Sequence, residues 1–571
     1  MTEPVTNQTP ALAPVTSEPE ASAAKSGGSL MRSSMIYSSL TLVSRFMGLA
    51  RDLVVTARIG ASATIAGDAY ATALAFPNLF RRIFAEGAFA AAFVPAYSKS
   101  LSEDGEEIAD QLAADAMASL AAATIILTIA AQLAMPWLMM IMNPGYVSDP
   151  EKFKLSVVLT QLAMPYLPCM AITAHLSGVL NARGRFGLSA AAPTLLNLMM
   201  LIFVLPQHEA HAAARWAVYG VVVSGVAQAM LLTWGVHRSG AKVHWRLPRL
   251  TPEIKKLLAL AVPGAIAASA TQINIFISGN LVSSVNGARN WLNVADRLYQ
   301  LPLGLVGVAI GVALLPRLSR AVHSGDTKDA QGAMDEAIAL ALAFCLPAAA
   351  ALIAMPYFLI DGLFTRGLFT TYDSVETAKT LLQYGWGVPA FVLTRILSPA
   401  FFARQDTKGP MTFALASVSV NVVLGIALFR LVGVQGIAAA TSAAAWLNVA
   451  LMMGALARRG TYRPSAAAWS RIIRIVLASL AAGLVMAAAT HWRSLVEAPF
   501  QFIHLTVGGA KALGAKEVAV LAVVAVAGML YPLFLFAFGG LTLTEVKGAL
   551  RRPAKVEQDP SAATVPPLDL G

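Results

Sequence analysis

Apolar residues in this chain are grouped into long runs, and short polar or charged stretches separate them. A helix needs about 20 apolar residues to cross the hydrocarbon core of a bilayer. The runs long enough to do so cover residues 33–58, 67–97, 113–142, 153–181, 187–206, 211–238, 254–285, 289–320, 328–356, 374–404, 409–431, 434–457, 468–491 and 515–540. Pro77 lies inside the second run and predicts a kink or break there. The pattern predicts an all-α polytopic membrane protein with about 14 transmembrane helices.

The composition agrees with this class of protein. Hydrophobic residues make up 57% of the 571 positions and charged residues 13%, against about 25% charged in soluble domains. The two ends differ, because residues 1–30 are rich in Ala, Pro, Thr, Ser and Glu, and residues 546–571 contain several prolines. Such segments bury too little apolar surface to fold, so we expect a disordered tail at each end.

Basic residues gather in alternate loops, which predicts the orientation of the chain in the membrane. The loops after even-numbered runs are rich in Lys and Arg, most densely at 237–256, whereas 142–152 and 356–373 hold few. Lys and Arg collect on the cytoplasmic side of membrane proteins, so both termini are predicted to be cytoplasmic. The net charge of +11 has the same origin, and nucleic acid is not expected as a partner.

The basic stretch at 237–256 also divides the chain. Six runs precede it, six follow it, and two more lie near the C-terminus. Paired sets of helices are common in transporters, with the substrate site where the two sets meet. The predicted domains are a cytoplasmic tail at 1–30, an N-terminal lobe at 31–240, a C-terminal lobe at 241–460, a terminal helix pair at 461–545 and a cytoplasmic tail at 546–571.

Four arginines lie inside runs that are otherwise apolar, namely Arg45, Arg51, Arg81 and Arg297. An arginine at mid-bilayer costs about 2.5–3.5 kcal/mol, so four that faced lipid would cost on the order of 10–14 kcal/mol by addition. We therefore expect them to face a polar, cationic cavity inside the helical bundle. The guanidinium fork matches phosphate and carboxylate groups, so the expected ligand is an anion.

The first run contains the sequence SRFMGLARD at 44–52. On an ideal helix Arg45, Gly48 and Asp52 share one face, whereas Arg51 points about 120° away. Both arginines can line one cavity if the helix bends, and Gly48 is a candidate for the bend. The alternative is that Arg51 and Asp52 mark the membrane edge, with Arg51 extending to the headgroups.

Polar and charged residues also interrupt the second run. Asn78 could occupy the break, while Arg82 and Glu86 are spaced i,i+4 and can pair. That pairing leaves Arg81 as the better candidate for uncompensated positive charge. Asp68 is a further acid in this run. The alternative for Arg82 and Glu86 is an ion pair with a purely structural role.

Later runs carry a smaller set of polar groups. Asp296 precedes Arg297 and could orient it or partly neutralise it. Gln272 and Asn274 lie in a polar stretch of the seventh run, and Arg395 lies in the tenth. Polar groups in apolar helices can bridge helices as well as contact a substrate, so both roles stay open for Gln272 and Asn274.

No pattern of catalytic residues accompanies these charges. The sequence contains no nucleotide-binding loop, nucleophile elbow or Cys/His metal spacing. Cys169 and Cys345 lie far apart in apolar runs, which is typical of packing residues. We therefore expect a protein that is not an enzyme and that uses no cofactor or metal.

These residues lie in motifs that resemble the MurJ (MviN) family, proposed lipid II flippases of bacterial peptidoglycan synthesis. The matching motifs are SRFMGLARD at 44–52, FPNLFRRIFAEGAFAAAFVP at 76–95, PTLLN at 193–197, ADRLYQLPLGLVGVAIGVALLP at 295–316 and ARQDTKGP at 403–410. The resemblance covers about 31–540 and implies membership of the MOP exporter superfamily. It implies two six-helix lobes in a V shape, plus two C-terminal helices that form a groove for a polyprenyl tail.

The resemblance also implies roles for individual residues. The substrate-binding arginines, which would contact a pyrophosphate or an acidic headgroup, are Arg45, Arg51, Arg81 and Arg297. The gating or charge-orienting groups would be Asp52, Asp68 and Glu86, to which we add Arg82 and Asp296 as neighbours of the arginines. From their positions in the apolar runs, and not from the resemblance, we add Asn78, Gln272, Asn274 and Arg395 as candidate polar groups of the cavity. Gln300 stands where some relatives carry Glu, which removes one possible gating carboxylate.

The expected function is transport of lipid II across the bacterial inner membrane, from the cytoplasmic to the periplasmic leaflet, by alternating access. The expected partners are lipid II and membrane lipids, with the cell-wall synthesis machinery as a further candidate. A MOP-type exporter of another polyprenyl-linked oligosaccharide is the alternative. A membrane-embedded transferase would need a catalytic acid or base and a carboxylate pair for a metal, and a scaffold would have no need for buried arginines.

Overall fold

The structure is a computed structural model, and it describes residues 43–80, 89–324, 326–404, 406, 408–503, 505–507 and 510–540. Over these residues the chain is almost entirely α-helical. It divides into two compact units. Unit 1 contains the described residues up to Gly60 together with Thr64–Ile273, and unit 2 contains Ala61–Ala63 together with the described residues from Asn274 onward.

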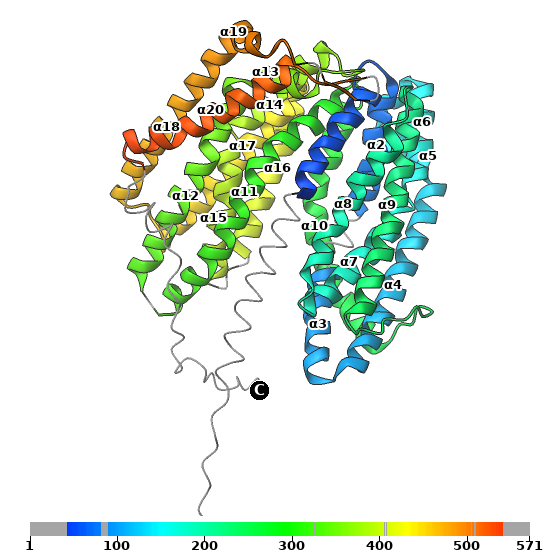
Figure 1. Cartoon of the computed structure of the whole chain (residues 1–571). Coiled ribbons are helices and arrows are strands. Elements are labelled where there is room, and N and C mark those ends of the chain that lie inside the picture. The colour runs from blue at the N-terminus through cyan, green and yellow to red at the C-terminus, as the bar shows by residue number, and fades with distance from the viewer. Residues whose placement is uncertain are drawn as a thin grey trace, which may run out of the picture. The chain divides into compact units, whose positions relative to one another are not determined.

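Unit 1 is a bundle of long helices (Figure 1). Its elements are a helix at 43–59, α2 (Ile65–Phe80), α3 (Phe89–Glu103), α4 (Glu106–Leu133), α5 (Met135–Met142), the 3-10 helix η2 (Pro144–Ser148), α6 (Pro150–Ala163), α7 (Tyr166–Ala182), α8 (Phe186–Val204), α9 (Ala210–Arg238) and the first part of α10 (Pro252–Val282). Within it α2 packs against α6, α4 against α7, and α8 along α9.

Small residues let these helices approach closely. A Cβ atom added at Gly220 of α9 would lie 3.2 Å from the Cα of Met200 on α8, and one at Gly225 would lie 2.8 Å from the Tyr166 ring on α7. Burying apolar side chains between helices gains little in a bilayer, because acyl chains are equally apolar. Helices in lipid therefore associate through close packing of this kind. Large apolar side chains face outward instead, such as Leu133 on α4, which is 74% exposed.

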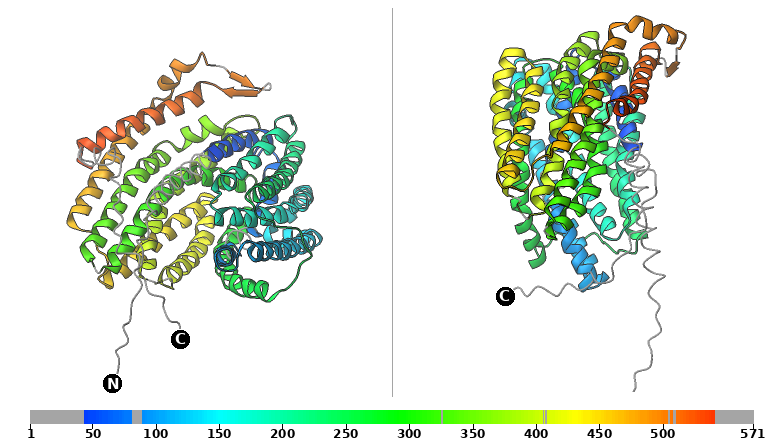
Figure 2. Two further views of the ribbon diagram at one scale, coloured as in Figure 1. Left: turned by 60° about the horizontal axis from the view of Figure 1, so that its bottom comes forward. Right: turned by 90° about the vertical axis from the view of Figure 1, so that its left-hand side faces the viewer.

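Unit 2 is also a helical bundle. Its elements are the rest of α10, α11 (Ala288–His323), α12 (Thr327–Ala354), α13 (Pro356–Phe364), α14 (Thr371–Gly385), α15 (Val388–Phe402), α16 (Lys408–Val432), α17 (Gln435–Arg458), α18 (Ala466–His491), α19 (Arg493–Glu497), the 3-10 helix η3 (Ala498–Phe500), β1 (Leu505–Val507), β2 (Ala510–Leu513) and α20 (Ala515–Ala537). α11 packs against α12, α14 and α15, and α16 lies along α17. Figure 2 shows α18 and α20 together at one side of this unit, with the antiparallel β1–β2 hairpin beyond them.

A buried carboxylate, Asp373, ties three segments of unit 2 together. It completes a capping box with Thr370 at the start of α14, and its Oδ2 accepts a hydrogen bond from Thr370 N at 2.9 Å. Its Oδ1 accepts from Ser62 N at 3.0 Å and from Trp291 Nε1 on α11 at 2.9 Å. The short segment Ala61–Ala63 is therefore held against α11 and α14 by one side chain.

An ionic cluster in unit 2 joins α13 to α19 and to the start of α20. Asp361 is 3% exposed and accepts hydrogen bonds from Arg493 and from Lys516, whose Nζ lies 3.1 Å from Asp361 Oδ2. Arg493 Nε also lies 2.5 Å from Glu497 Oε1. Burial alone would raise the pKa of Asp361, but the hydrogen bonds, led by that from Arg493, outweigh burial and hold this pKa below its usual range. The carboxylate is thus kept ionised in a buried position by the two cations around it.

The predicted all-α fold is confirmed. Ten helices among the described residues are long and apolar enough to cross a membrane, and the count of 14 stays a prediction because parts of the chain lie outside the described residues. α2 continues through Pro77 to Phe80, so the helix is not broken at that proline. The two compact units meet in sequence within α10, between Ile273 and Asn274, while the predicted lobe boundary at residue 240 stays a prediction.

Substitution of Gly287 tests the packing of Ala61–Ala63. Gly287 precedes α11 with φ at 85°, and a Cβ there would lie 2.9 Å from Ser62 N. A left-handed conformation costs a non-glycine residue about 1–3 kcal/mol, so we expect Gly287→Ala to lower the free energy of unfolding by at least about 1 kcal/mol. The measurement is denaturant-induced unfolding of the purified protein in mixed micelles. Gly332→Ala is the matched control, since nothing lies within 4 Å of a Cβ at that position in α12, and it should not destabilise the protein. Equal effects at the two positions would contradict the proposed packing.

Candidate anion-binding site

The helix at 43–59 carries an arginine that is bound on two sides within unit 1. The Arg51 side chain is 11% exposed and that of Asp52 is 21% exposed. Arg51 Nε and Nη2 donate to Asp52 Oδ1 at 2.9 and 2.5 Å. Arg51 Nη1 donates to Asn197 Oδ1 on α8 at 2.9 Å. An acid of its own helix and an amide of a second helix therefore fix the position of this guanidinium group.

Asn197 uses both ends of its amide to join α8 to this helix. Its Nδ2 donates to the carbonyl oxygen of Ser44 at 2.9 Å, while its oxygen accepts from Arg51. A Cβ atom at Gly48 would lie 3.7 Å from Asn197 Nδ2, so the two helices are in contact here. Asn197 is 5% exposed, and a buried amide needs such partners to offset the loss of water.

Arg45 lies on the same helix in a different environment. It is exposed at the surface of unit 1, whereas most of the Arg51 side chain is buried. This difference follows from the separation of about 120° between them on an ideal helix. The helix is not interrupted at Gly48. Arg45 can therefore donate to a ligand, while three nitrogen atoms of Arg51 already donate to protein groups.

Asp68 on α2 forms a buried ion pair with Lys152 on α6. Lys152 Nζ lies 2.6 Å from Asp68 Oδ2, and the two side chains are 2% and 3% exposed, respectively. The same ammonium group lies 4.4 Å from the centre of the Tyr146 ring, a favourable cation–π distance. The Tyr146 hydroxyl group lies 2.9 Å from Thr72 Oγ1 on α2. Asp68 therefore contributes to the contact between α2 and the segment from η2 to α6, and its predicted gating role stays a prediction.

The remainder of the second predicted run is only partly described. Asn78 is half-buried near the end of α2. Arg81, Arg82 and Glu86 lie outside the described residues, so their predicted roles stay predictions.

In unit 2, α11 carries Asp296 and Arg297. Gln300 Nε2 donates a hydrogen bond to the Asp296 carboxylate one turn earlier, and Arg297 is exposed. The Tyr299 ring packs against that of Tyr384 on α14, with centroids 4.6 Å apart. The amide of Gln300 can donate to Asp296, whereas an ionised glutamate in that place would repel it. The Asp296 carboxylate therefore has a hydrogen-bond donor on its own helix.

The other predicted polar groups occupy separate positions. Arg395 is exposed on α15, which packs against α11. On α10, Gln272 is 8% exposed and Asn274 is half-buried. Among the described residues, no three His, Cys, Asp or Glu side chains are grouped so that they could hold a metal ion. The groups present are guanidinium and amide donors, which suit reversible binding of an anion.

The sequence analysis did not identify Asn197 as the partner of Arg51 or Lys152 as the partner of Asp68. Asn197 lies inside the PTLLN motif at 193–197, so a polar residue in an apolar run was the available signal. Lys152 lies in the predicted loop at 142–152, so its sequence context is that of a loop lysine. A buried Asp68 required a cation, but the sequence offered no means to choose Lys152 over its exposed neighbour Lys154.

The fold is shared with known membrane transporters. A solved inward-facing structure of a multidrug resistance MATE family transporter of the MOP superfamily superimposes with a TM-score of 0.60 at 13% identity, covering 74% of this chain and 97% of that one. A solved structure of the lipid II flippase MurJ in an inward closed conformation gives a TM-score of 0.69 at 24% identity, covering 88% and 98%. The chain therefore has the fold of a MOP superfamily transporter.

The sequence assigns the family within this class. The family described as lipid II flippase MurJ matches residues 56–507. A probable lipid II flippase MurJ from Rhizobium meliloti (strain 1021) is 36% identical over 532 residues, which cover 92% of this chain and 97% of that protein. The chain belongs to the MurJ family. The relatives are named as flippases, which confirms the prediction of a transporter and not an enzyme.

The buried ion pair gives a testable expectation. Removing one partner of such a pair leaves an uncompensated charge and costs about 3–5 kcal/mol, so Lys152→Met should lower the free energy of unfolding by that order. Lys154→Met, at an exposed position of α6, is the control and should change it little. Replacing both partners, as in Asp68→Leu with Lys152→Met, should recover most of the loss. The measurement is unfolding in mixed micelles, and equal stability of the two single variants would contradict a buried pair.

Proposed function

We propose that this protein moves lipid II from the cytoplasmic to the periplasmic leaflet of the bacterial inner membrane. The observation that carries the proposal is the family match over 56–507, made by a chain that places arginines on apolar helices. The lipid has an anionic pyrophosphate, which would be the group recognised in the membrane. The reaction changes no covalent bond, in agreement with the transporter class of the relatives.

The arginines would bind the pyrophosphate or an acidic part of the headgroup in a central cationic cavity. Arg45 and Arg297 support this role because each is exposed on a helix of its own unit. Arg51 would contribute through the two of its five N–H groups that remain after its bonds to Asp52 and Asn197. Arg81 is included on the family motif at 76–95 alone, because it lies outside the described residues.

Alternating access would supply the movement. Each compact unit has its own packed interior, and in transporters built from two helical sets the sets rock about a binding site that lies where they meet. In this proposal the headgroup stays on the arginines while access changes from one side of the membrane to the other. The polyprenyl tail would remain in lipid or in the groove proposed for α18 and α20, with further polar contacts from Asn78, Gln272, Asn274 and Arg395.

An exporter of another polyprenyl-linked oligosaccharide is the second candidate. It shares the pyrophosphate and the tail, so the arginines alone do not separate the two substrates. The family match favours lipid II. Binding of lipid II in preference to a polyprenyl pyrophosphate that carries a different oligosaccharide would decide between them. An association with cell-wall synthesis machinery stays a prediction.

The proposed orientation can be tested by cysteine labelling. In a chain with Cys169→Ser and Cys345→Ala, a cysteine at exposed Ser148 should react in intact cells with an impermeant thiol reagent, because the loop at 142–152 is predicted to be periplasmic. A cysteine at exposed Asp104, in the predicted cytoplasmic loop at 97–112, should react only after lysis. The reverse pattern would overturn the assignment of both termini to the cytoplasm.

The anion-binding role of Arg297 can be measured with purified protein. A hydrogen bond to a charged group contributes about 1.5–3 kcal/mol, so Arg297→Ala should raise the Kd for lipid II on the order of tenfold to a hundredfold. Undecaprenyl pyrophosphate should compete with lipid II, and an uncharged polyprenol should compete far less. The control is Arg458→Ala, which removes an exposed arginine from the last turn of α17 and should leave the Kd unchanged.

The same binding experiment has an outcome that would contradict the anion-binding role of Arg297. If Arg297→Ala weakened binding of the pyrophosphate lipid and of the neutral polyprenol equally, Arg297 would support the tail groove or the fold. Arg297→Lys adds a further check, because Lys keeps the charge and loses the paired donors of the guanidinium group. Full affinity in Arg297→Lys would show that charge alone suffices.

A further inference from the structure

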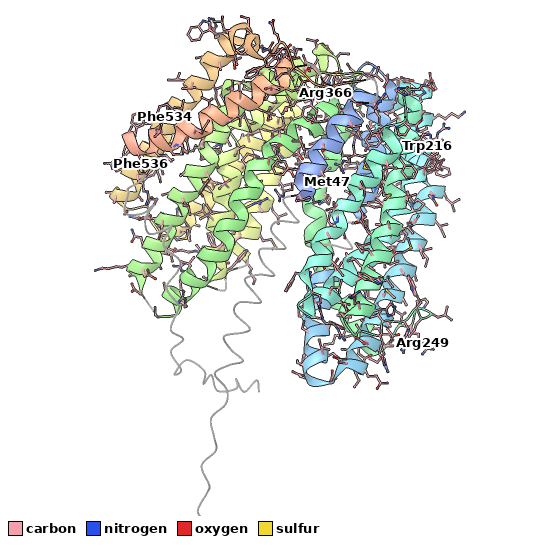
Figure 3. The ribbon with its side chains drawn as sticks, viewed as in Figure 1. Met47, Trp216, Arg249, Arg366, Phe534 and Phe536 are labelled. Atoms are coloured by element: carbon pink, nitrogen blue, oxygen red, sulfur yellow. The ribbon has the colours of Figure 1, made fainter. Side chains whose placement is uncertain are left out.

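The connection between α9 and α10 is a non-helical segment of unit 1, and we call residues 241–251 the linker strap. Its first part is anchored in the core, since Ala241 is 1% exposed and Val243 is 4% exposed, in a cluster with residues of α4 and α7. Residues 244–250 of the strap are exposed. Figure 3 shows Arg249 on this segment, at one end of the unit 1 bundle and on its outside.

The strap follows the first half of α4. The contacts that hold it are Lys242 N to Asp110 Oδ2 at 2.6 Å, Arg246 Nη1 to Asp115 Oδ1 at 3.9 Å, and Ser119 Oγ to the carbonyl oxygen of Arg249 at 3.5 Å. Asp110 and Ser119 are nine positions apart, a rise of about 14 Å on a helix. α4 is itself one of the helices apolar enough to cross a membrane. The strap therefore runs from the polar start of α4 toward the part that enters the bilayer.

Large apolar side chains project from this part of the strap. Trp245 is 62% exposed, Leu247 81% and Leu250 66%. They alternate with Arg246 and Arg249, so apolar and cationic groups occur together over six residues. Tryptophan and arginine in this combination are typical of the interface between headgroups and acyl chains.

The charge around the strap is strongly positive. Exposed cations from the end of α9 to the start of α10 are Arg238, Lys242, Arg246, Arg249, Lys255 and Lys256, and Glu253 is the one acid in that stretch. Two acids of α4 face the strap. Asp110 already accepts hydrogen bonds from Arg183 and from the strap backbone, and Asp115 lies near Arg246. The cations therefore outnumber the acids on this surface.

We infer that the linker strap binds an anionic lipid surface, with Trp245, Leu247 and Leu250 in the upper acyl-chain region and Arg246 and Arg249 on lipid phosphates. The exposed apolar side chains and the excess of cations together identify this partner. The apolar side chains fit a bilayer and not a soluble polyanion, and the cations select a bilayer of negative surface potential. The inference is independent of the proposed substrate site, since none of these residues belongs to it.

The experiment uses the full chain in liposomes, with a bimane fluorophore on a cysteine at position 247 in the Cys169→Ser, Cys345→Ala background. Liposomes contain phosphatidylcholine alone or with about one third phosphatidylglycerol, an anionic fraction chosen to give a negative surface. Phosphatidylcholine with a doxyl group near the head of its acyl chain should quench the fluorophore, and aqueous iodide should not. Photoactivatable phosphatidylglycerol should crosslink to the strap several-fold more than photoactivatable phosphatidylcholine.

The variant Arg246→Gln, Arg249→Gln should remove most of that headgroup preference while unfolding and lipid II affinity stay unchanged. Its matched control is Arg215→Gln, at an exposed position beside Trp216 near the other end of α9, which should leave the preference intact. Strong quenching by iodide would overturn lipid contact, and protection from both quenchers would show that protein covers the strap. Equal crosslinking by the two lipids would overturn the selection of anionic headgroups. Because lipid II binding is measured on the same variants, failure of this inference is distinguishable from failure of the proposed function.

Discussion

A charged side chain on a membrane-spanning helix must have a counter-charge, hydrogen-bond partners or water, because lipid supplies none of them. This requirement organises the polar contacts of the described chain. Arg51 is bound by Asp52 and by Asn197 of another helix, and Lys152 is bound by Asp68 across the contact between α6 and α2. Each contact that satisfies a charge also fixes the positions of two helices. Arg51 and Lys152 therefore hold pairs of helices together, whether or not a ligand is bound.

The same requirement separates the arginines into two kinds. Arg51 is mostly enclosed by protein, whereas Arg45 and Arg297 are exposed on apolar helices. Three nitrogen atoms of Arg51 already donate to Asp52 and Asn197, so the protein fixes the position of this guanidinium group. A headgroup that crosses the membrane has to be bound and then released. If the arginines bind the headgroup as proposed, Arg51 would be held in a fixed position by the protein, while Arg45 and Arg297 would be accessible to the headgroup.

Periodicity and charge in the sequence were sufficient for the fold class and for the angular separation of Arg45 and Arg51, because both depend on local helix geometry. They were not sufficient for Lys152 or Asn197, because the partner of a buried charge is set by which helices pack together. The β1–β2 hairpin and the ionic cluster around Asp361 were missed for a related reason. The hairpin, Asp361 and Arg493 lie in connections between the predicted apolar runs, where neither a period of 3.6 nor hydrophobic length gives a signal.

The hydrogen bond between Ser62 N and Asp373 joins residues 311 positions apart, and this separation has a consequence for biosynthesis. At about 5–20 residues per second, a ribosome needs roughly 15 to 60 s to add the residues between them. Through that interval the segment Ala61–Ala63 has left the ribosome, yet the carboxylate that holds it does not exist. The contacts of this early turn with Asp373 can therefore form only after α14 has been synthesised. The turn at Ala61–Ala63 is therefore completed when distant helices of unit 2 pack together, and not during local folding of the early chain.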